Sequence, residues 1–271
     1  MYNLLKISSL DGITKLTSYY WKWIYKMKNL EFLHKNTFSY EKYQQMVKTY
    51  QEEGKVLDWF DYIYQSANGD FSKVFWADLE PSPYLISWLK KEVIQKTKKS
   101  ACVIGCGVGD DAEALSEFGF KVTAFDISQT AIDLCKKRYP DTKVDYLVAD
   151  LFDYPKEWFE NFDVVYECNT IQVLPNEYRK KARAAMSSLL AKDGYILVSC
   201  RSREENEKEN EIPKPLAKSE LDEFKTIDNL KEQSFLAYDD EQIPSVPHYF
   251  VIYKKWLFKL LILTFFLIFY T

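Results

Sequence analysis

A glycine-rich loop between an expected strand and an expected helix constrains this chain more than any other feature. The apolar run 101–104 is followed by Gly105, Gly107 and Gly109. Glycine lets the backbone pass close to a ligand where a side chain would obstruct the approach. The helix expected over 111–118 adds free amide groups that favour a carboxylate or a phosphate. The pattern therefore predicts a ligand-binding turn after the first strand of an α/β sheet.

Strand and helix patterns alternate beyond this loop, which is typical of a doubly wound, mostly parallel α/β sheet. We expect further strands over 122–125, 144–148, 163–166, 195–200, 235–238 and 249–253. The expected helices between them are 128–139, 176–190 and 219–224. The charge-rich stretch 201–211 is expected to be a solvated loop, with a functional lid as the alternative.

The pattern divides the chain into four segments. They are an uncertain N-terminal extension 1–39, a helical lead-in or cover 40–99 with helices over 40–60 and 84–94, the core domain 100–255, and a hydrophobic C-terminal tail 256–271. A membrane-spanning helix needs about 20 apolar residues, with a lower limit of ~17, and the tail falls just short. It is a weak membrane anchor, a buried extension or a translated artefact.

Composition excludes several other classes of protein. Lys and Arg number 36 against 40 Asp and Glu, so the net charge of −4 offers no basic footprint for nucleic acid. The five cysteines form no Cys-x-x-Cys pair, which argues against a disulfide framework or a zinc site. The two histidines lie far apart in sequence, so we expect no metal. A reducing, cytoplasmic location fits this cysteine usage.

Two acidic residues bear on the kind of ligand. Asp126 falls about 20 residues after the first glycine, where a carboxylate accepts hydrogen bonds from ribose hydroxyls. Proteins that bind NAD share this feature, and a capping or loop role is the alternative. Asp110 stands where a dinucleotide fingerprint has its third glycine. An acidic residue repels a pyrophosphate but tolerates a ligand that carries an amino group and a sulfonium.

Two later strand ends complete the predicted cleft. After the third strand, Asp150 is placed to bond the amino group of an adenine, and Leu151 is placed to pack on the ring. Beyond the fourth strand lie Glu167, Asn169 and Gln172, at the switch point where open α/β sheets bind ligands.

Together these segments resemble the class I S-adenosylmethionine-dependent methyltransferases, and within them the branch that includes the thiopurine and halide/thiol methyltransferases. The matching segments are residues 105–113, 125–128 and 149–152, with a Trp-containing lead-in at 76–81 and a late loop at 213–220. The resemblance implies a seven-stranded sheet, S-adenosyl-L-methionine as cofactor, and enzymatic methyl transfer to a small-molecule acceptor. That acceptor is expected to be a thiol, a halide or another soft nucleophile.

The resemblance and the strand ends together give the candidate residues. Candidates for cofactor binding are Gly105, Cys106, Gly107, Gly109, Asp110, Asp126, Ile127, Asp150, Leu151, Glu167 and Trp76. Candidates for substrate contact are Asp78, Asn169 and Gln172, and no catalytic residue is assigned.

Three positions among these candidates carry open alternatives. Trp76 is either a cover over the cofactor or a core residue, and for Asp78 a loop or capping role competes with substrate contact. Many relatives have an acidic residue where this chain has Val103. In this chain the contact to the methionine amino group would then pass to Asp110 or to Glu167.

Three functions are compatible with the sequence. The first is a small-molecule methyltransferase, and the second is a methyltransferase-like protein that binds the cofactor without turnover. The third, a nicotinamide-dependent oxidoreductase, is disfavoured by the glycine spacing. Membrane association through the tail 256–271 is a minor alternative, and the sequence leaves the oligomeric state and the acceptor open.

Overall fold

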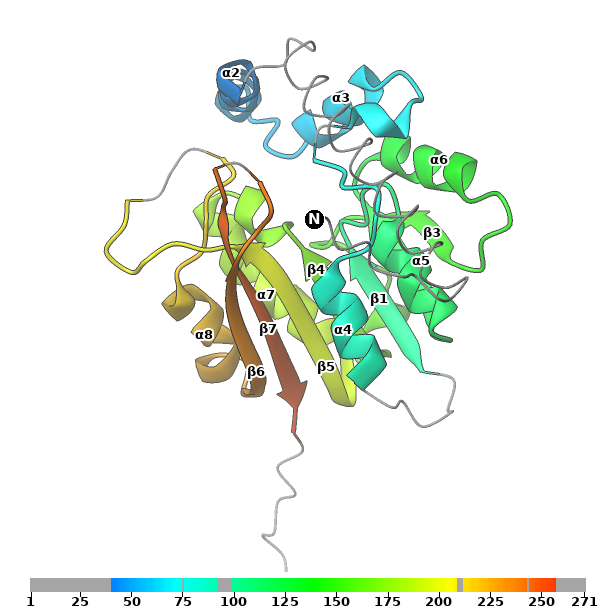
Figure 1. Cartoon of the computed structure of the whole chain (residues 1–271), viewed down its shortest axis with the longest axis vertical. Coiled ribbons are helices and arrows are strands. Elements are labelled where there is room, and N and C mark those ends of the chain that lie inside the picture. Colours follow the sequence, from blue (N-terminus) through cyan, green and yellow to red (C-terminus); the bar gives the residue numbers. More distant parts are fainter. Residues whose placement is uncertain (1–39, 75, 92–98, 209–211, 243, 257–271) are drawn as a thin grey trace, which may run out of the picture. The chain divides into compact units, whose positions relative to one another are not determined.

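The computed structural model describes residues 40–74, 76–91, 99–208, 212–242 and 244–256 (Figure 1). The expectations for the extension 1–39 and for nearly all of the tail, 257–271, lie outside the described residues. The chain divides into two units, Met1–Met46 and Val47–Thr271. The sheet and the candidate site belong to the second unit.

A seven-stranded sheet with the strand order β3-β2-β1-β4-β5-β7-β6 forms the centre of this unit (Figure 1). Its strands are β1 Ser100–Ile104, β2 Lys121–Asp126, β3 Asp145–Val148, β4 Phe162–Cys168, β5 Leu190–Arg201, β6 Leu230–Asp239 and β7 Pro247–Lys255. Strands β1 to β5 pair in parallel, and β7 is antiparallel to both β5 and β6. The expected doubly wound, mostly parallel, seven-stranded fold is confirmed.

Helices cover both faces of the sheet (Figure 1). One face packs against α4 Pro83–Lys91, α5 Asp110–Glu117 and α6 Gln129–Arg138. The other packs against α7 Asn176–Leu189 and α8 Lys218–Thr226. In α7, the fully buried Ala182, Met186 and Leu189 recur at helical spacing, which gives this helix its apolar face.

The lead-in differs from the single helix expected over 40–60. It forms α2 Tyr40–Glu52 and a separate α3 Trp59–Ser66. The break follows from Gly54, whose φ of 74° is a left-handed conformation that ends a helix. Downstream, the 3-10 helix η1 Phe71–Lys73 precedes an irregular stretch, and α4 begins at Pro83, where proline is well tolerated.

The parallel strands bring the predicted site residues to one edge of the sheet. Ile104 at the end of β1 pairs with Phe125 on β2 and with Glu167 on β4. The glycine loop therefore starts between Phe125, the residue before Asp126, and Glu167. Strand β4 runs two residues further than expected, so Glu167 lies within the strand and not beyond it.

Candidate functional site

The glycine loop adopts the backbone that its sequence predicts. Gly105, Gly107 and Gly109 have φ values of 60°, 56° and 96°, a region that other residues rarely enter. A Cβ at Gly105 would lie 2.6 Å from the Thr170 hydroxyl, and one at Gly109 would lie 2.5 Å from the Tyr146 hydroxyl. Internal packing therefore requires these two glycines.

Of the three loop glycines, Gly107 has the most open surroundings. A Cβ there would come no closer than 3.4 Å to the nearest atom, the hydroxyl of Tyr64. Its backbone N–H donates to Oδ2 of Asp126 over 3.1 Å, while Oδ1 of Asp126 accepts from the N–H of Ser128 over 3.0 Å. Burial raises the pKa of Asp126 to about 6, and the two backbone hydrogen bonds oppose that rise. The loop and the end of β2 are thus joined through one buried carboxylate.

Apolar side chains beside Asp126 remain in contact with solvent. Ile127 is 37% exposed and Val148 is 45% exposed. Val148 pairs with Asp126 across β2 and β3, so both apolar side chains flank the same carboxylate. Further on, Asp150 accepts from the N–H of Phe152 over 2.8 Å, and Leu151 is buried in the core on the α7 side.

Asp110 is held by an arginine. Arg138 donates to both of its carboxylate oxygens, over 2.6 and 2.7 Å, and both side chains are 13% exposed. The same guanidinium donates to the carbonyl oxygens of Val108 and Leu79. The negative charge of Asp110 is therefore compensated within the protein, which leaves it less able to bind a cation or to repel a pyrophosphate.

Glu167 is fully buried at the end of β4. Its Oε2 accepts from the N–H groups of Thr170 and Ile171, over 2.9 and 3.3 Å. Its Oε1 has no hydrogen-bond partner among the described residues. Burial raises the pKa of Glu167 to about 8, and the two backbone hydrogen bonds oppose that rise.

The two other candidates on this side make contacts within the fold. The N–H of Asn169 donates to the carbonyl oxygen of Ser199 over 2.8 Å. The side-chain oxygen of Gln172, which is buried, accepts from the N–H of Arg201 over 2.6 Å. Gln172 thus ties the 3-10 helix η3 Ile171–Val173 to β5.

Trp76 packs against α3. Its indole N–H donates to the Tyr64 hydroxyl over 3.2 Å, and its ring stands edge-on to the rings of Tyr64 and Trp59. Tyr64 is a buried residue beside the glycine loop that the sequence analysis missed. The spacing of the buried Trp59, Ile63 and Tyr64 would have predicted this face of α3. Asp78, in the same stretch as Trp76, is exposed to solvent.

Two hydrogen bonds to Asp111 connect the lead-in to the core. The N–H of Ser82 donates to Asp111 over 2.7 Å, and the hydroxyl of Tyr166 donates to the other oxygen of that carboxylate over 3.0 Å. Burial raises the pKa of Asp111 to about 6. The stretch that contains Trp76 and Asp78 is therefore fixed at its carboxyl end.

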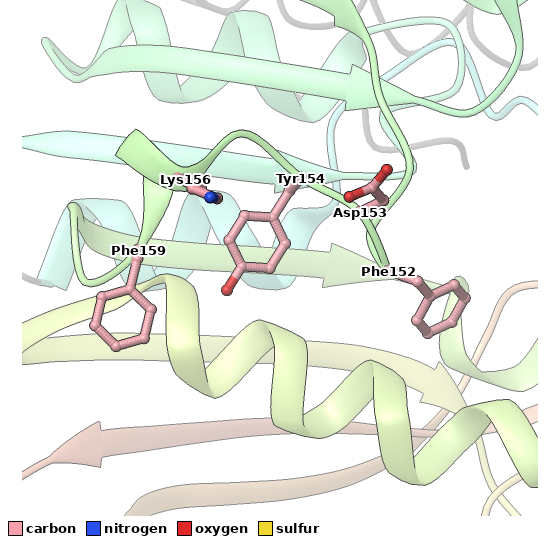
Figure 2. Close-up of a pocket in the computed structure, with 5 residues that line it drawn as sticks. All are labelled: Phe152, Asp153, Tyr154, Lys156 and Phe159. Atoms are coloured by element: carbon pink, nitrogen blue, oxygen red, sulfur yellow. The ribbon is translucent and has the colours of Figure 1, made fainter.

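A surface hollow of about 490 Å³ lies along the segment that follows β3. Figure 2 shows its lining, which comes from the loop between β3 and β4: Phe152, Asp153, Tyr154, Lys156 and Phe159. It is open to solvent, and a single loop supplies all of its lining. A ligand site needs polar groups that converge from several elements, so the strand ends are the better candidate.

Two further kinds of feature are absent from the part of the chain that the structure describes. It holds no cluster of His, Cys, Asp and Glu side chains that could bind a metal ion. None of its helices is long and apolar enough to cross a membrane.

Comparisons with known proteins agree with this geometry. Residues 102–194 match a family model described as a methyltransferase domain. A SAM-dependent methyltransferase from Methanosarcina mazei has a similar structure, with a TM-score of 0.55 at 15% identity, over 66% of this chain and 99% of that one. No curated protein matches the sequence.

Two other solved structures show how widely the fold is used. A 1,6-didemethyltoxoflavin-N1-methyltransferase from Burkholderia thailandensis aligns with a TM-score of 0.53 at 13% identity, over 82% of this chain and 92% of that one. The cyclase SpnF aligns with a TM-score of 0.55 at 11% identity, over 64% of this chain and 80% of that one. These structures establish the fold, and residues 102–194 are the part of the chain that matches the methyltransferase-domain model.

Proposed function

We propose that this chain is an S-adenosylmethionine-dependent methyltransferase that acts on a small-molecule acceptor. The observation that carries the proposal is the hydrogen bond between the Gly107 N–H and Asp126, inside the segment that matches a methyltransferase domain. It joins the glycine loop to the carboxyl end of β2. Glu167 stands beside the loop on β4, where open α/β sheets bind their ligands.

The residues at these strand ends fit the chemistry of the cofactor. The carboxylate of Asp126 suits ribose hydroxyls, and the exposed faces of Ile127 and Val148 suit an adenine ring. The unpartnered oxygen of Glu167 suits a cationic group. When bound, the cofactor supplies a methyl group that its sulfonium has already activated.

The protein's contribution to such a transfer is mainly positioning. Methyl transfer from a sulfonium is an in-line displacement, and holding donor and acceptor in line supplies much of the acceleration. A thiolate, a halide or another soft nucleophile needs little help from a general base. We therefore assign binding and orienting roles to the strand-end residues and no proton transfer.

The branch and the acceptor are part of the proposal. The resemblance of residues 76–81 and 213–220 to thiopurine and halide/thiol methyltransferases favours a soft nucleophile. A second candidate is a protein that binds the cofactor without turnover. The same fold occurs in a cyclase, so the fold alone does not fix the activity.

Two measurements test the proposal. Calorimetry should detect binding of S-adenosylhomocysteine and none of NAD, and the reverse result would refute it. Turnover of S-adenosylmethionine on a panel of thiols, halides, small acids and amines then separates the enzyme from the silent binder. Binding without turnover on the whole panel would favour the second candidate.

A further inference from the structure

Glu167 differs from the other carboxylates at the strand ends. Asp110 has Arg138 as its counter-ion, and Asp126 accepts backbone hydrogen bonds on both oxygens. Glu167 accepts on Oε2 alone, and its Oε1 is buried without a partner among the described residues. An unpaired buried carboxylate oxygen costs free energy in either protonation state, so its presence points to a missing partner.

No cation within the described protein supplies that partner. Burial and the two backbone hydrogen bonds from Thr170 and Ile171 account for the shifted pKa of Glu167. The titratable groups that interact with it are the thiols of Cys168 on β4 and Cys200 on β5. Burial raises the pKa of both thiols, which keeps them uncharged at neutral pH.

Glu167 lies beside the start of the glycine loop. Glu167 pairs directly with Ile104, the residue before Gly105. Thr170, whose N–H donates to Glu167, also donates its hydroxyl to the carbonyl oxygen of Ile104 over 3.2 Å. The carboxylate and the glycine loop are therefore parts of one rigid arrangement.

We infer that Glu167 binds the protonated amino group of a ligand through Oε1. The inference rests on the proposed function, because the amino-acid end of S-adenosylmethionine carries such an ammonium group. A cationic amine acceptor is the other source of the same chemistry. Asp110, the other candidate for this contact, already pairs with Arg138 and is not needed.

Binding of the ammonium has a proton balance that can be measured. In the free protein the carboxyl of Glu167 holds a proton at neutral pH, since its pKa is about 8. An ammonium at Oε1 stabilises the carboxylate, so the carboxyl gives its proton to solvent as the ion pair forms. Up to one proton is released for each ligand bound.

The experiment compares two ligands that differ in the amino-acid end. S-adenosylhomocysteine carries the ammonium, and 5′-methylthioadenosine lacks it. Calorimetry at pH 7 in two buffers of different ionisation enthalpy gives the affinity and the number of protons released. In the wild type, S-adenosylhomocysteine should release a fraction of a proton that methylthioadenosine does not. Equal affinity and equal proton release for the two ligands would overturn the assignment to the cofactor.

Variants separate the two sources of the ammonium. Glu167→Gln should weaken binding of S-adenosylhomocysteine roughly 10- to 100-fold, the effect of losing a charge-assisted hydrogen bond, and leave methylthioadenosine within about threefold. Glu177→Gln, an exposed residue at the start of α7, is the matched control. If Glu167→Gln leaves cofactor binding unchanged but raises the KM of an amine acceptor, the acceptor supplies the ammonium.

Two outcomes keep this inference distinct from the proposed function. If the wild type fails to bind S-adenosylhomocysteine, the proposed function itself is wrong. If the wild type binds it and Glu167→Gln alters neither affinity, KM nor proton release, the role of Glu167 alone is wrong. Should Glu167→Gln fail to fold, the comparison of S-adenosylhomocysteine with methylthioadenosine on the wild type, in affinity and proton release, still tests the role of Glu167.

Discussion

The indole N–H of Trp76 donates to the hydroxyl of Tyr64, and the two rings meet edge to face with centroids 5.3 Å apart. The hydroxyl of Tyr64 in turn is the atom nearest to the position that a Cβ at Gly107 would take, 3.4 Å away. A chain of contacts thus runs from the irregular lead-in through α3 to the glycine loop. Trp76 is half-buried in it and so is poised to respond when the loop binds a ligand.

The first prediction concerns this contact. Trp76→Ala should weaken binding of S-adenosylhomocysteine severalfold or more, because it removes the ring that supports Tyr64. Trp76→Phe keeps a ring and loses one hydrogen bond, which costs about 1 kcal/mol of stability. Addition of ligand should change the tryptophan fluorescence of the wild type and of a Trp158→Phe control, and change that of Trp76→Phe less.

A different outcome would assign Trp76 to the core. If Trp76→Ala unfolds the protein without ligand, while Trp76→Phe retains the full ligand-induced signal, the residue supports the fold and does not cover the cofactor. Thermal denaturation with and without ligand separates these two roles.

The second prediction concerns Asp126. Asp126→Ala should lower cofactor affinity roughly tenfold or more, since each charge-assisted hydrogen bond to ribose contributes about 1.5–3 kcal/mol. The same change leaves the N–H groups of Gly107 and Ser128 without an acceptor, so stability should also fall by about 1–3 kcal/mol. Asp141→Ala, an exposed position in the turn before β3, is the control. Unchanged affinity in calorimetry would move the ribose site elsewhere.

The third prediction concerns the pair of Arg138 and Asp110. Arg138→Gln should destabilise the protein by about 3 kcal/mol, because it leaves a largely buried carboxylate without its counter-ion. Arg138→Lys should recover only part of this loss, since an ammonium cannot reproduce the two-pronged hydrogen bonding. The double variant Arg138→Gln with Asp110→Asn should be more stable than Arg138→Gln alone. Denaturant unfolding measures all three, and strictly additive effects would show that the pair contributes no coupling.

The sequence predicted the positions of the strands along the chain and the turn at Gly105 because both depend on local patterns. Apolar runs, glycines and the N-cap at Ser128 act within a few residues of one another. Contacts between distant residues escaped prediction. Arg138 and Asp110 lie 28 residues apart, so the pairing that compensates Asp110 is visible only once α5 and α6 lie side by side.

The lead-in was harder to predict than the core. Apolar and aromatic residues at roughly helical spacing before and after Gly54 suggested one helix over 40–60, and the left-handed turn at Gly54 divides it. With the second helix unrecognised, Tyr64 went unnoticed although it lies beside the glycine loop. Glu167 was predicted as a site residue from the strand end, but its unpartnered oxygen depends on the folded backbone of residues 168–171.

The last prediction concerns pH. A carboxyl whose pKa is higher in the folded state than in the unfolded state contributes stability that is lost as pH rises through the folded value. Glu167 rises from 4.5 to about 8, whereas Asp111 and Asp126 reach only about 6. Burial lowers the pKa of His248 below 6.5, so above about pH 7 that group is mostly neutral in both the folded and the unfolded state.

Between about pH 7 and 8, Glu167 should therefore dominate the pH dependence. The free energy of unfolding of the ligand-free protein should fall as pH rises, by at most about 1.4 kcal/mol per pH unit, because the unfolded state has lost a proton that the folded state retains. Glu167→Gln should flatten this slope, while Glu177→Gln should leave it unchanged. Urea unfolding at several pH values measures it. A wild-type stability that stays constant or rises across this range would show that Glu167 is already ionised in the free protein.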